Sequence, residues 1–245
     1  MSKPSKALTA AVTAEAAPAR QPSRDARGAR RQAVADVRRS LILAAARSAF
    51  FESGLEGASL REIARRAGYT PGAIYSYFES KEDVYGALLG ESLERLNQFV
   101  SAAACDDPTG NGLSALRGAQ RKIQVKAEAF FEFYRENPRD LDLGFYLFHG
   151  MKPRGLTPAL NARLNGRLRD ALAPVRDGFM ELGLTPGDAQ TEVTALFAHI
   201  VGLLLLSHTG RIRMFRQESY DLFQRYLEHM LARASTLART SGAGR

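Results

Sequence analysis

A helix that ends and restarts within a few residues constrains this chain more than any other feature. The stretch SLREIARRAGYTPGAIYSYFESKE covers residues 59–82, and it places Gly68, Pro71 and Gly72 close together in an otherwise helical composition. Glycine allows a sharp backbone turn. Thr70 followed by Pro71 is typical of an N-cap and a first helical residue, where the missing proline N–H is not needed. The sequence therefore predicts two short helices joined by a tight turn.

Capping patterns place the neighbouring helices. Ser59 and Glu62 have the spacing of a capping box, in which each side chain bonds the backbone N–H of the other residue, and Ser80 with Asp83 repeats the pattern. Upstream, apolar residues at helical spacing predict a helix over about 34–53. This order of elements is typical of a helix-turn-helix unit, whose second helix enters the DNA major groove.

Side chains on and beside the second helix are the candidates for DNA contact. Tyr75 and Tyr77 carry hydroxyls that can reach phosphates or base edges, and they lie about 200° apart on the helix, so both cannot face the core. Lys81 opposes the dipole of the next helix, which predicts a phosphate partner or a contact with Glu79. The alternative is a packed helical hairpin in which Tyr75 and Phe78 are core residues.

Four segments in order carry a family resemblance: ILAAARSAFFESG, SLREIARRAG, YTPGAIYSYF and SKEDVYGALL. Together they resemble the TetR family of bacterial transcriptional regulators over about residues 40–89. The resemblance implies an all-α fold of about nine helices, with an N-terminal three-helix DNA-binding head and a C-terminal helical domain for ligand binding and dimerisation. Tyr69 departs from the small aliphatic residue usual in the family. The DNA contacts implied by the resemblance are Ser59, Thr70, Pro71, Gly72, Tyr75, Tyr77 and Lys81.

Positive charge is concentrated at the N-terminus. Residues 1–40 hold nine Lys or Arg against three acids (9 − 3 = +6), whereas residues 41–90 hold five basic and six acidic residues (5 − 6 = −1). Residues 1–36 have almost no large apolar side chains to offset the entropy of ordering, which predicts a disordered basic arm. Such an arm suits DNA, or it is a solvated tail that aids solubility.

Beyond the head, Asp, Pro and Gly signals separate further helical segments. The predicted helices cover about residues 113–136, 158–182, 186–208 and 215–234. The expected organisation is a disordered arm (1–36), a helix-turn-helix domain (37–83), a helical ligand-binding and dimerisation domain (84–236) and a flexible tail (237–245).

The last two long helices are the candidates for a homodimer interface. Residues 186–208 are apolar almost all round, as in a helix covered on several sides. Two such helices from each subunit can form a four-helix interface, and two-fold DNA sites favour a two-fold protein. The alternative is that both helices fill the monomer core. The apolar run 193–208 is shorter than a membrane span of about 20 residues, so we expect a buried helix and no membrane partner.

Aromatic side chains between the head and these helices are candidates for an effector pocket, with core packing as the alternative for each. Two histidines among them can orient a small molecule. The candidate ligand-binding residues are Phe130, Phe133, Tyr134, Phe145, Phe148, His149, Phe179 and His199.

The cysteine content and the sequence motifs bear on the possible activity of the protein and on its cellular location. The one cysteine, Cys105, excludes an internal disulfide or a cysteine-based metal cluster, and it fits the reducing cytoplasm, as does an N-terminus without a signal-peptide core. Motifs for catalysis, cofactor binding or metal binding are absent, so we expect neither an enzyme, a cofactor nor a metal. The predicted function is a repressor that a small molecule releases from a palindromic DNA operator. The alternatives are a DNA-binding regulator without an effector, and a helical enzyme.

Overall fold

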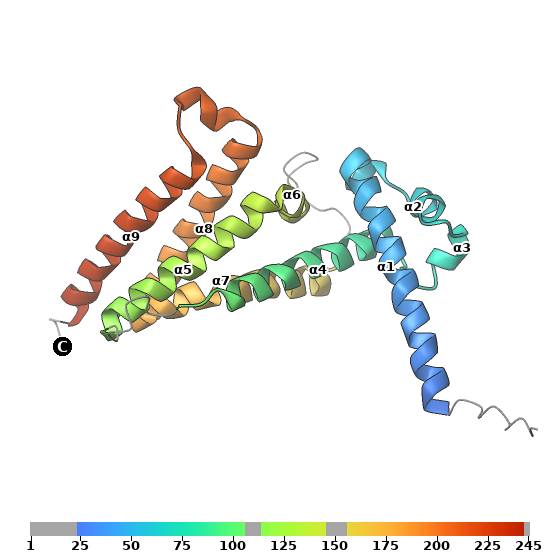
Figure 1. Cartoon of the computed structure of the whole chain (residues 1–245), viewed down its shortest axis with the longest axis horizontal. Coiled ribbons are helices and arrows are strands. Elements are labelled where there is room, and N and C mark those ends of the chain that lie inside the picture. The colour runs from blue at the N-terminus through green and yellow to red at the C-terminus, as the bar shows by residue number, and fades with distance from the viewer. Residues whose placement is uncertain (1–23, 106–113, 146–155, 243–245) are drawn as a thin grey trace, which may run out of the picture. The chain divides into compact units, whose positions relative to one another are not determined.

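The computed structural model describes residues 24–105, 114–145 and 156–242 (Figure 1). In these ranges the chain forms nine α-helices and one short 3₁₀ helix, with no strand, which confirms the all-α fold and the helix number. The elements are α1 (Arg24–Gly57), α2 (Leu60–Ala67), α3 (Pro71–Ile74), α4 (Lys81–Ala102), α5 (Ala115–Glu136), α6 (Pro138–Phe145), α7 (Pro158–Glu181), α8 (Pro186–His208), η1 (Arg211–Phe215) and α9 (Ser219–Gly242).

The chain divides into two compact units, residues 1–40 and 41–245. In the first unit, α1 begins at Arg24, so the predicted disorder was wrong for residues 24–36. Alanine, arginine and glutamine favour helix, and extending a helix that already exists avoids the cost of nucleation. Residues 1–23 lie outside the described residues.

The second unit contains both the helix-turn-helix segment and the helices that follow it. The expected domain boundary at residues 83 and 84 falls inside α4, whose first turns pack into the head. The rings of Phe50 in α1 and Tyr85 in α4 meet edge to face, with centroids 6.4 Å apart. α4 is therefore shared between the head and the body.

Helix α7 is the centre of the body and packs against α4, α5 and α8. Two glycines allow these close crossings. A Cβ atom at Gly86 of α4 would lie 2.6 Å from the side chain of Leu160, and one at Gly178 of α7 would lie 2.7 Å from Ile123. These positions need the smallest residue because a neighbouring side chain already fills the space.

Helices α8 and α9 form a hairpin joined through η1 (Figure 1). Among the described residues, α8 is the one helix long and apolar enough to cross a membrane, judged by length and composition alone. Its Val193, Leu196 and Ile200 side chains are buried in the protein core, as in a core helix.

Helix α9 is longer than predicted, because it continues to Gly242. The expected flexible tail was therefore wrong for residues 237–242, while residues 243–245 lie outside the described part of the chain. Packing explains the difference: Ala238 lies against the hydrophobic core and anchors this last stretch of the helix.

Candidate nucleic-acid interface

The turn between α2 and α3 depends on one glycine. Gly68 has φ 74° and ψ 25°, the left-handed conformation that residues with a Cβ atom rarely adopt. Its N–H lies at the α2 C-terminus and donates to the carbonyl of Arg65 at 3.3 Å. This cap ends α2 and redirects the chain, as the sequence predicted.

Helix α3 starts as predicted and ends earlier than predicted. The Thr70 hydroxyl accepts from the backbone N–H of Ala73 at 3.3 Å, and Pro71 occupies the first helical position. The helix ends at Ile74, and the residues up to Tyr77 form a turn in place of the helix expected to reach Phe78.

Three fully buried apolar residues fix the crossing of the two short helices. Ile63 and Ala64 of α2 and Ile74 of α3 are completely inaccessible to solvent. The small side chain of Ala64 lets the helices approach closely, and the two isoleucines fill the space between them. The outer face of α3 is thereby turned away from the core.

The predicted DNA contacts lie mostly on this outer face. Ser59, Thr70, Pro71 and Gly72 are exposed, and no atom lies within 4 Å of where a Cβ on Gly72 would stand. The Ser59 hydroxyl accepts from the Glu62 N–H at 3.2 Å, so it also caps α2. The surface around Gly72 is thus open to a close approach by a large ligand.

The aromatic residues after α3 divide between surface and core. Tyr75 is 58% exposed, whereas Phe78 is buried. Tyr77 is half-buried and packs against the core with part of its surface. The hairpin alternative therefore holds for Phe78 and does not hold for Tyr75, which is more exposed than Tyr69, Tyr77 and Tyr85.

Lys81 is bonded within the protein. Its ammonium group donates to the carbonyl oxygens of Leu55 at 2.8 Å and Glu56 at 3.3 Å, at the end of α1. Neither phosphate nor Glu79, the two partners considered from the sequence, is needed to account for its position. Local sequence does not indicate that a lysine in the first turn of one helix will bond the C-terminus of another helix.

An ion-pair network that the sequence analysis missed ties α1 to α2. Arg66 donates to Glu52 at 2.8 Å and to Glu62 at 2.6 Å, and Arg65 also bonds Glu62. Hydrogen bonds from Arg65 and Arg66 lower the pKa of the Glu62 carboxyl from 4.5 to about 2. The i, i+4 spacing of Glu62 and Arg66 could have indicated half of this network. The Glu62 carboxylate thus accepts hydrogen bonds from these arginines, whereas the sequence predicted that it would accept one from the backbone N–H of Ser59.

Four of the six predicted effector residues that the structure describes are core residues. Phe130, Phe133, Tyr134 and Phe179 are almost completely buried. Burial also raises the pKa of the Tyr134 hydroxyl well above its usual value. Phe148 and His149 lie outside the described residues.

Two of the candidates border a small cavity. Tyr134 and Phe145 line a space of about 290 Å³ between α4, α5, α6 and α7, together with leucines such as Leu168. Their ring centroids are 6.0 Å apart. The sequence analysis therefore found two residues that border this cavity.

The candidate His199 lies elsewhere, between α8 and α9. Its ring stacks on Tyr226 with centroids 3.8 Å apart. Within the described residues, its Nε2 atom is buried without a hydrogen-bond partner, and burial lowers the pKa of the imidazole. His199 thus stacks on α9, whereas Phe197, two residues earlier on α8, contacts the aromatic candidates Phe130 and Phe145.

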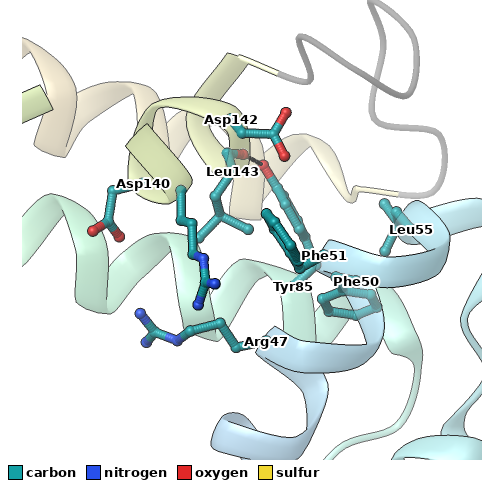
Figure 2. A pocket seen from close by; sticks show the side chains of 9 residues that line it. Arg47, Phe50, Phe51, Leu55, Tyr85, Asp140, Asp142 and Leu143 are labelled. Carbon is teal, nitrogen blue, oxygen red and sulfur yellow. Dashed lines mark hydrogen bonds between the residues drawn. The ribbon is translucent and has the colours of Figure 1, made fainter. Parts of the chain in front are cut away.

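A larger hollow, missed by the sequence analysis, lies where α1, α4 and α6 meet (Figure 2). It encloses about 580 Å³ of empty space, part of which is open to solvent. The hydroxyl of Tyr85 donates to the backbone carbonyl of Leu143, the bond drawn in Figure 2, and so joins α4 to α6. The nine lining residues are Arg47, Phe50, Phe51, Leu55, Tyr85, Arg139, Asp140, Asp142 and Leu143.

The hollow combines aromatic surface with charged groups. Phe51 is 54% exposed, and the Arg139 guanidinium lies 4.5 Å from its ring centroid. Asp140 is neutralised by Arg95 at 2.6 Å, while Arg47 pairs more loosely with Glu91 at 3.7 Å. Its lining resembles that of small-molecule sites, which are mostly apolar with a few polar groups.

Metal binding has no comparable site. Across residues 24–105, 114–145 and 156–242, no group of three or more His, Cys, Asp or Glu side chains is placed to hold a metal ion.

Comparison with known proteins adds to this geometry. Residues 42–88 match the family described as bacterial regulatory proteins, tetR family. Over 109 residues the chain is 28% identical to an uncharacterised HTH-type transcriptional regulator, YdgC, of Bacillus subtilis, covering 44% of this chain and 53% of YdgC. It is 43% identical over 80 residues to the HTH-type transcriptional repressor BepR of Brucella suis, covering 32% of this chain and 38% of BepR. The chain thus matches about half or less of the length of these curated relatives.

The chain is also similar to an activator, whereas BepR is a repressor. The HTH-type transcriptional activator FasR of Mycolicibacterium smegmatis is 31% identical over 110 residues, which cover 45% of this chain and 46% of FasR. Similarity to the DNA-binding segment therefore does not distinguish a repressor from an activator.

Solved structures share the fold over most of the chain. A tetR-family regulatory protein from Rhodococcus RHA1 is 20% identical with a TM-score of 0.56, covering 80% of this chain and 95% of that one. The transcriptional regulator FadR from Bacillus subtilis, solved in complex with stearoyl-CoA, is 18% identical with a TM-score of 0.52, covering 78% of this chain and 97% of that one. At these identities the likeness shows the fold alone.

Proposed function

We propose that this chain, which its helix-turn-helix segment places in the tetR family of bacterial regulatory proteins, is a sequence-specific DNA-binding transcriptional repressor released from its operator by a small molecule. It acts in the cytoplasm, where bacterial DNA is accessible. Its relatives include the repressor BepR and the activator FasR, so repression is the part of this proposal that a functional assay has to test. A transcription assay with the cognate promoter distinguishes repression from activation.

One observation carries the DNA-binding proposal: the outer face of α3 and the turn after it are open to solvent. Thr70, Pro71, Gly72 and Tyr75 are exposed on this face, while Ile74 anchors its opposite side. The N-terminal residues of a recognition helix are those that reach base edges in the major groove. Lys81 is not needed for this proposal, because its ammonium group already donates to the carbonyl oxygens of Leu55 and Glu56 in α1.

We also propose that two copies of the chain associate through α8 and α9. Helix α8 is strongly apolar, and in the single chain Ala195, Ala198 and Leu206 on this helix are exposed while Val201 and Leu205 are only half-buried. A second copy covering α8 and α9 would remove that surface from water. Such a homodimer would present two recognition helices to successive major grooves, about 34 Å apart, at a palindromic operator.

The experiment is selection of bound fragments from genomic DNA by the purified full chain, followed by affinity measurements on the recovered site. We expect a two-fold symmetric site. Tyr75→Phe removes one hydroxyl and should weaken binding to this site, and Tyr75→Ala should weaken it further. Tyr220→Phe is the matched control, since it removes a hydroxyl from another exposed tyrosine, on α9. Recovery of no preferred site, or equal effects of the Tyr75 and Tyr220 changes, contradicts the proposal.

The hollow between α1, α4 and α6 is our candidate for the effector site. It is larger than the cavity beside Tyr134 and Phe145, and its walls come from the head and from the body. A ligand that binds better in one arrangement of these helices shifts the protein toward it. Occupancy of this hollow is thereby linked to the helix that precedes the DNA-binding turn.

Two filling substitutions distinguish the two cavities. Leu143→Trp narrows the hollow, and Leu168→Trp narrows the cavity beside Tyr134. Compounds that raise the melting temperature of the unchanged protein should lose this effect with Leu143→Trp and keep it with Leu168→Trp. The reverse pattern assigns the effector to the smaller cavity and overturns this placement, while DNA binding by both variants verifies their folding.

A further inference from the structure

We infer that residues 27–38 of α1 present an arginine face that binds the phosphate backbone of DNA, adding a second contact surface to each subunit. The inference rests on the proposed DNA-binding function. It follows from three features of the molecule: most basic side chains of the head have partners within the protein, the N-terminal part of α1 is helical, and its charges are segregated by face.

The head has little positive charge left for phosphates. Residues 42–88 contain five basic and six acidic residues (5 − 6 = −1). Four of the five basic side chains have partners in the structure: Arg65 and Arg66 bond Glu62, Lys81 bonds α1 carbonyls, and Arg47 pairs with Glu91. Phosphate attraction is the sequence-independent part of DNA affinity, so charge from outside the head is needed.

The N-terminal part of α1 has that charge. Residues 24–40 carry six arginines and two aspartates (6 − 2 = +4). This stretch is helical, and the side chains of Arg27, Arg30, Arg31, Arg38 and Arg39 are all exposed. Exposed arginines bind phosphate well because the planar guanidinium can donate two parallel hydrogen bonds.

Helical geometry separates the two signs of charge. At about 100° per residue, Arg27, Arg31 and Arg38 fall within about 40° of one another around the helix. Asp25 and Asp36 fall about 150° away from the centre of that face. The Asp36 carboxylate also accepts a hydrogen bond from Gln32 at 2.9 Å, on the acidic side. The arginine face is therefore free of the acids carried by the same helix.

A helix changes what the arm can do. The arginines of a disordered arm have no fixed spacing or direction. A helix rises about 1.5 Å per residue, so it holds Arg31 and Arg38 about 10 Å apart on one face. Such a row can follow a phosphate backbone with less loss of conformational entropy on binding. Among polyanions, DNA is the partner favoured here because the head lacks the cations that its own proposed ligand needs.

The test compares two variants of the full chain with equal charge changes. Arg31→Gln/Arg38→Gln removes two arginines from the face, and Arg30→Gln/Arg39→Gln removes two that lie about 80–100° away from its centre. Glutamine and arginine have similar helix propensities, so the helix should persist in both, which circular dichroism checks. Affinity for the selected operator and for a scrambled duplex is measured over a series of salt concentrations.

We expect the face variant to bind both duplexes more weakly, with a salt slope reduced by about 0.9 for each lost phosphate contact, or about 1.8 per subunit. The control variant should change the slope much less. Equal slopes for the two variants, or an unchanged slope for the face variant, overturn the inference. So does a face variant that keeps its DNA affinity but loses binding to vesicles of anionic lipid. Failure of the unchanged protein to bind any duplex would instead overturn the proposed function, so the two failures are distinguishable.

Discussion

The ammonium group of Lys81 donates a 2.8 Å hydrogen bond to the carbonyl oxygen of Leu55, joining the first turn of α4 to the end of α1. The last carbonyls of a helix have no partner within it, and a cation there also complements the negative end of the helix dipole. Lys81 therefore caps α1 and fixes where α4 leaves the head.

Lys81→Met should destabilise the protein, because the α1 carbonyls lose a charged donor near the core. We expect a loss of about 1–2 kcal/mol in the free energy of unfolding, measured by chemical denaturation. The salt dependence of DNA binding should stay the same. Lys122→Met on α5 removes a lysine that bonds Glu181 at 2.6 Å on the surface, and as a control it should cost less than about 1 kcal/mol. A reduced salt slope with unchanged stability would restore the phosphate role for Lys81.

Gly68→Ala should destabilise the head through its backbone. The residue has φ 74° with open space around it, so the cost is conformational, about 1–2 kcal/mol. Gly72→Ala is the matched comparison, because it also meets open space but stands in the first turn of α3. It should leave stability unchanged or raise it slightly while weakening DNA binding, if backbone and phosphate approach closely there. Similar losses of stability in both variants would contradict this reading of the turn.

Acid should loosen the junction of α1 and α2. The pKa of the Glu62 carboxyl is lowered to about 2 by Arg65 and Arg66, so the folded state binds this proton less readily than the unfolded state does. Its contribution to stability is therefore full above about pH 4.5 and disappears as the pH falls toward 2. Glu62→Gln should flatten this part of the stability–pH curve, recorded by thermal denaturation between pH 2 and 6. A curve as steep as that of the unchanged protein would place the acid sensitivity elsewhere.

Lys126 is a buried cation with a purely structural environment. Its ammonium group donates to the carbonyl oxygens of Val100, Ser101 and Ala103 at 2.7–2.9 Å, at the end of α4. Lys126→Met leaves these carbonyls without their donor and should lower the free energy of unfolding by about 2–3 kcal/mol. Lys126→Arg keeps the charge and should recover part of the loss. Denaturation curves that coincide with the unchanged protein would show that water replaces the lysine.

The dimer proposal predicts a selective effect on α8. Ala198 is exposed on this helix in the single chain, so Ala198→Glu places a charge at the proposed interface without disturbing the core. We expect a monomer with retained helicity and much weaker operator binding, measured by analytical ultracentrifugation and by DNA titration. Ala162→Glu on α7, also an exposed alanine, should remain dimeric. An Ala198→Glu protein that stays dimeric would exclude this face.

Local sequence was sufficient wherever the interaction is local. The N-caps at Ser59, Thr70 and Ser80 and the sharp turn at Gly68 were predicted because each involves residues no more than a few positions apart. The same reasoning failed at the chain ends, where residues 24–36 and 237–242 are helical. The prediction for these two stretches considered only their composition and not the adjacent helix that each of them extends.

The candidate effector residues show the opposite case. Aromatic composition alone selected Phe130 and Phe179, which are completely buried, along with Tyr134 and Phe145, which border a cavity. The hollow lined by Phe51, Tyr85 and Leu143 draws on three helices separated by loops. No spacing rule connects such residues, since their proximity depends on how α6 is set against α1 and α4.

The sequence by itself determined the all-α fold, the positions of the helix starts around the turn, and which segment is suited to DNA, because hydrophobic periodicity, caps and backbone freedom act over a few residues. The tertiary structure alone decided that Lys81 and Arg66 have partners within the protein, that Tyr75 is exposed while Phe78 is buried, and where the hollow between α1, α4 and α6 lies. These outcomes depend on which distant groups share a desolvated space, and that is fixed only when the helices pack.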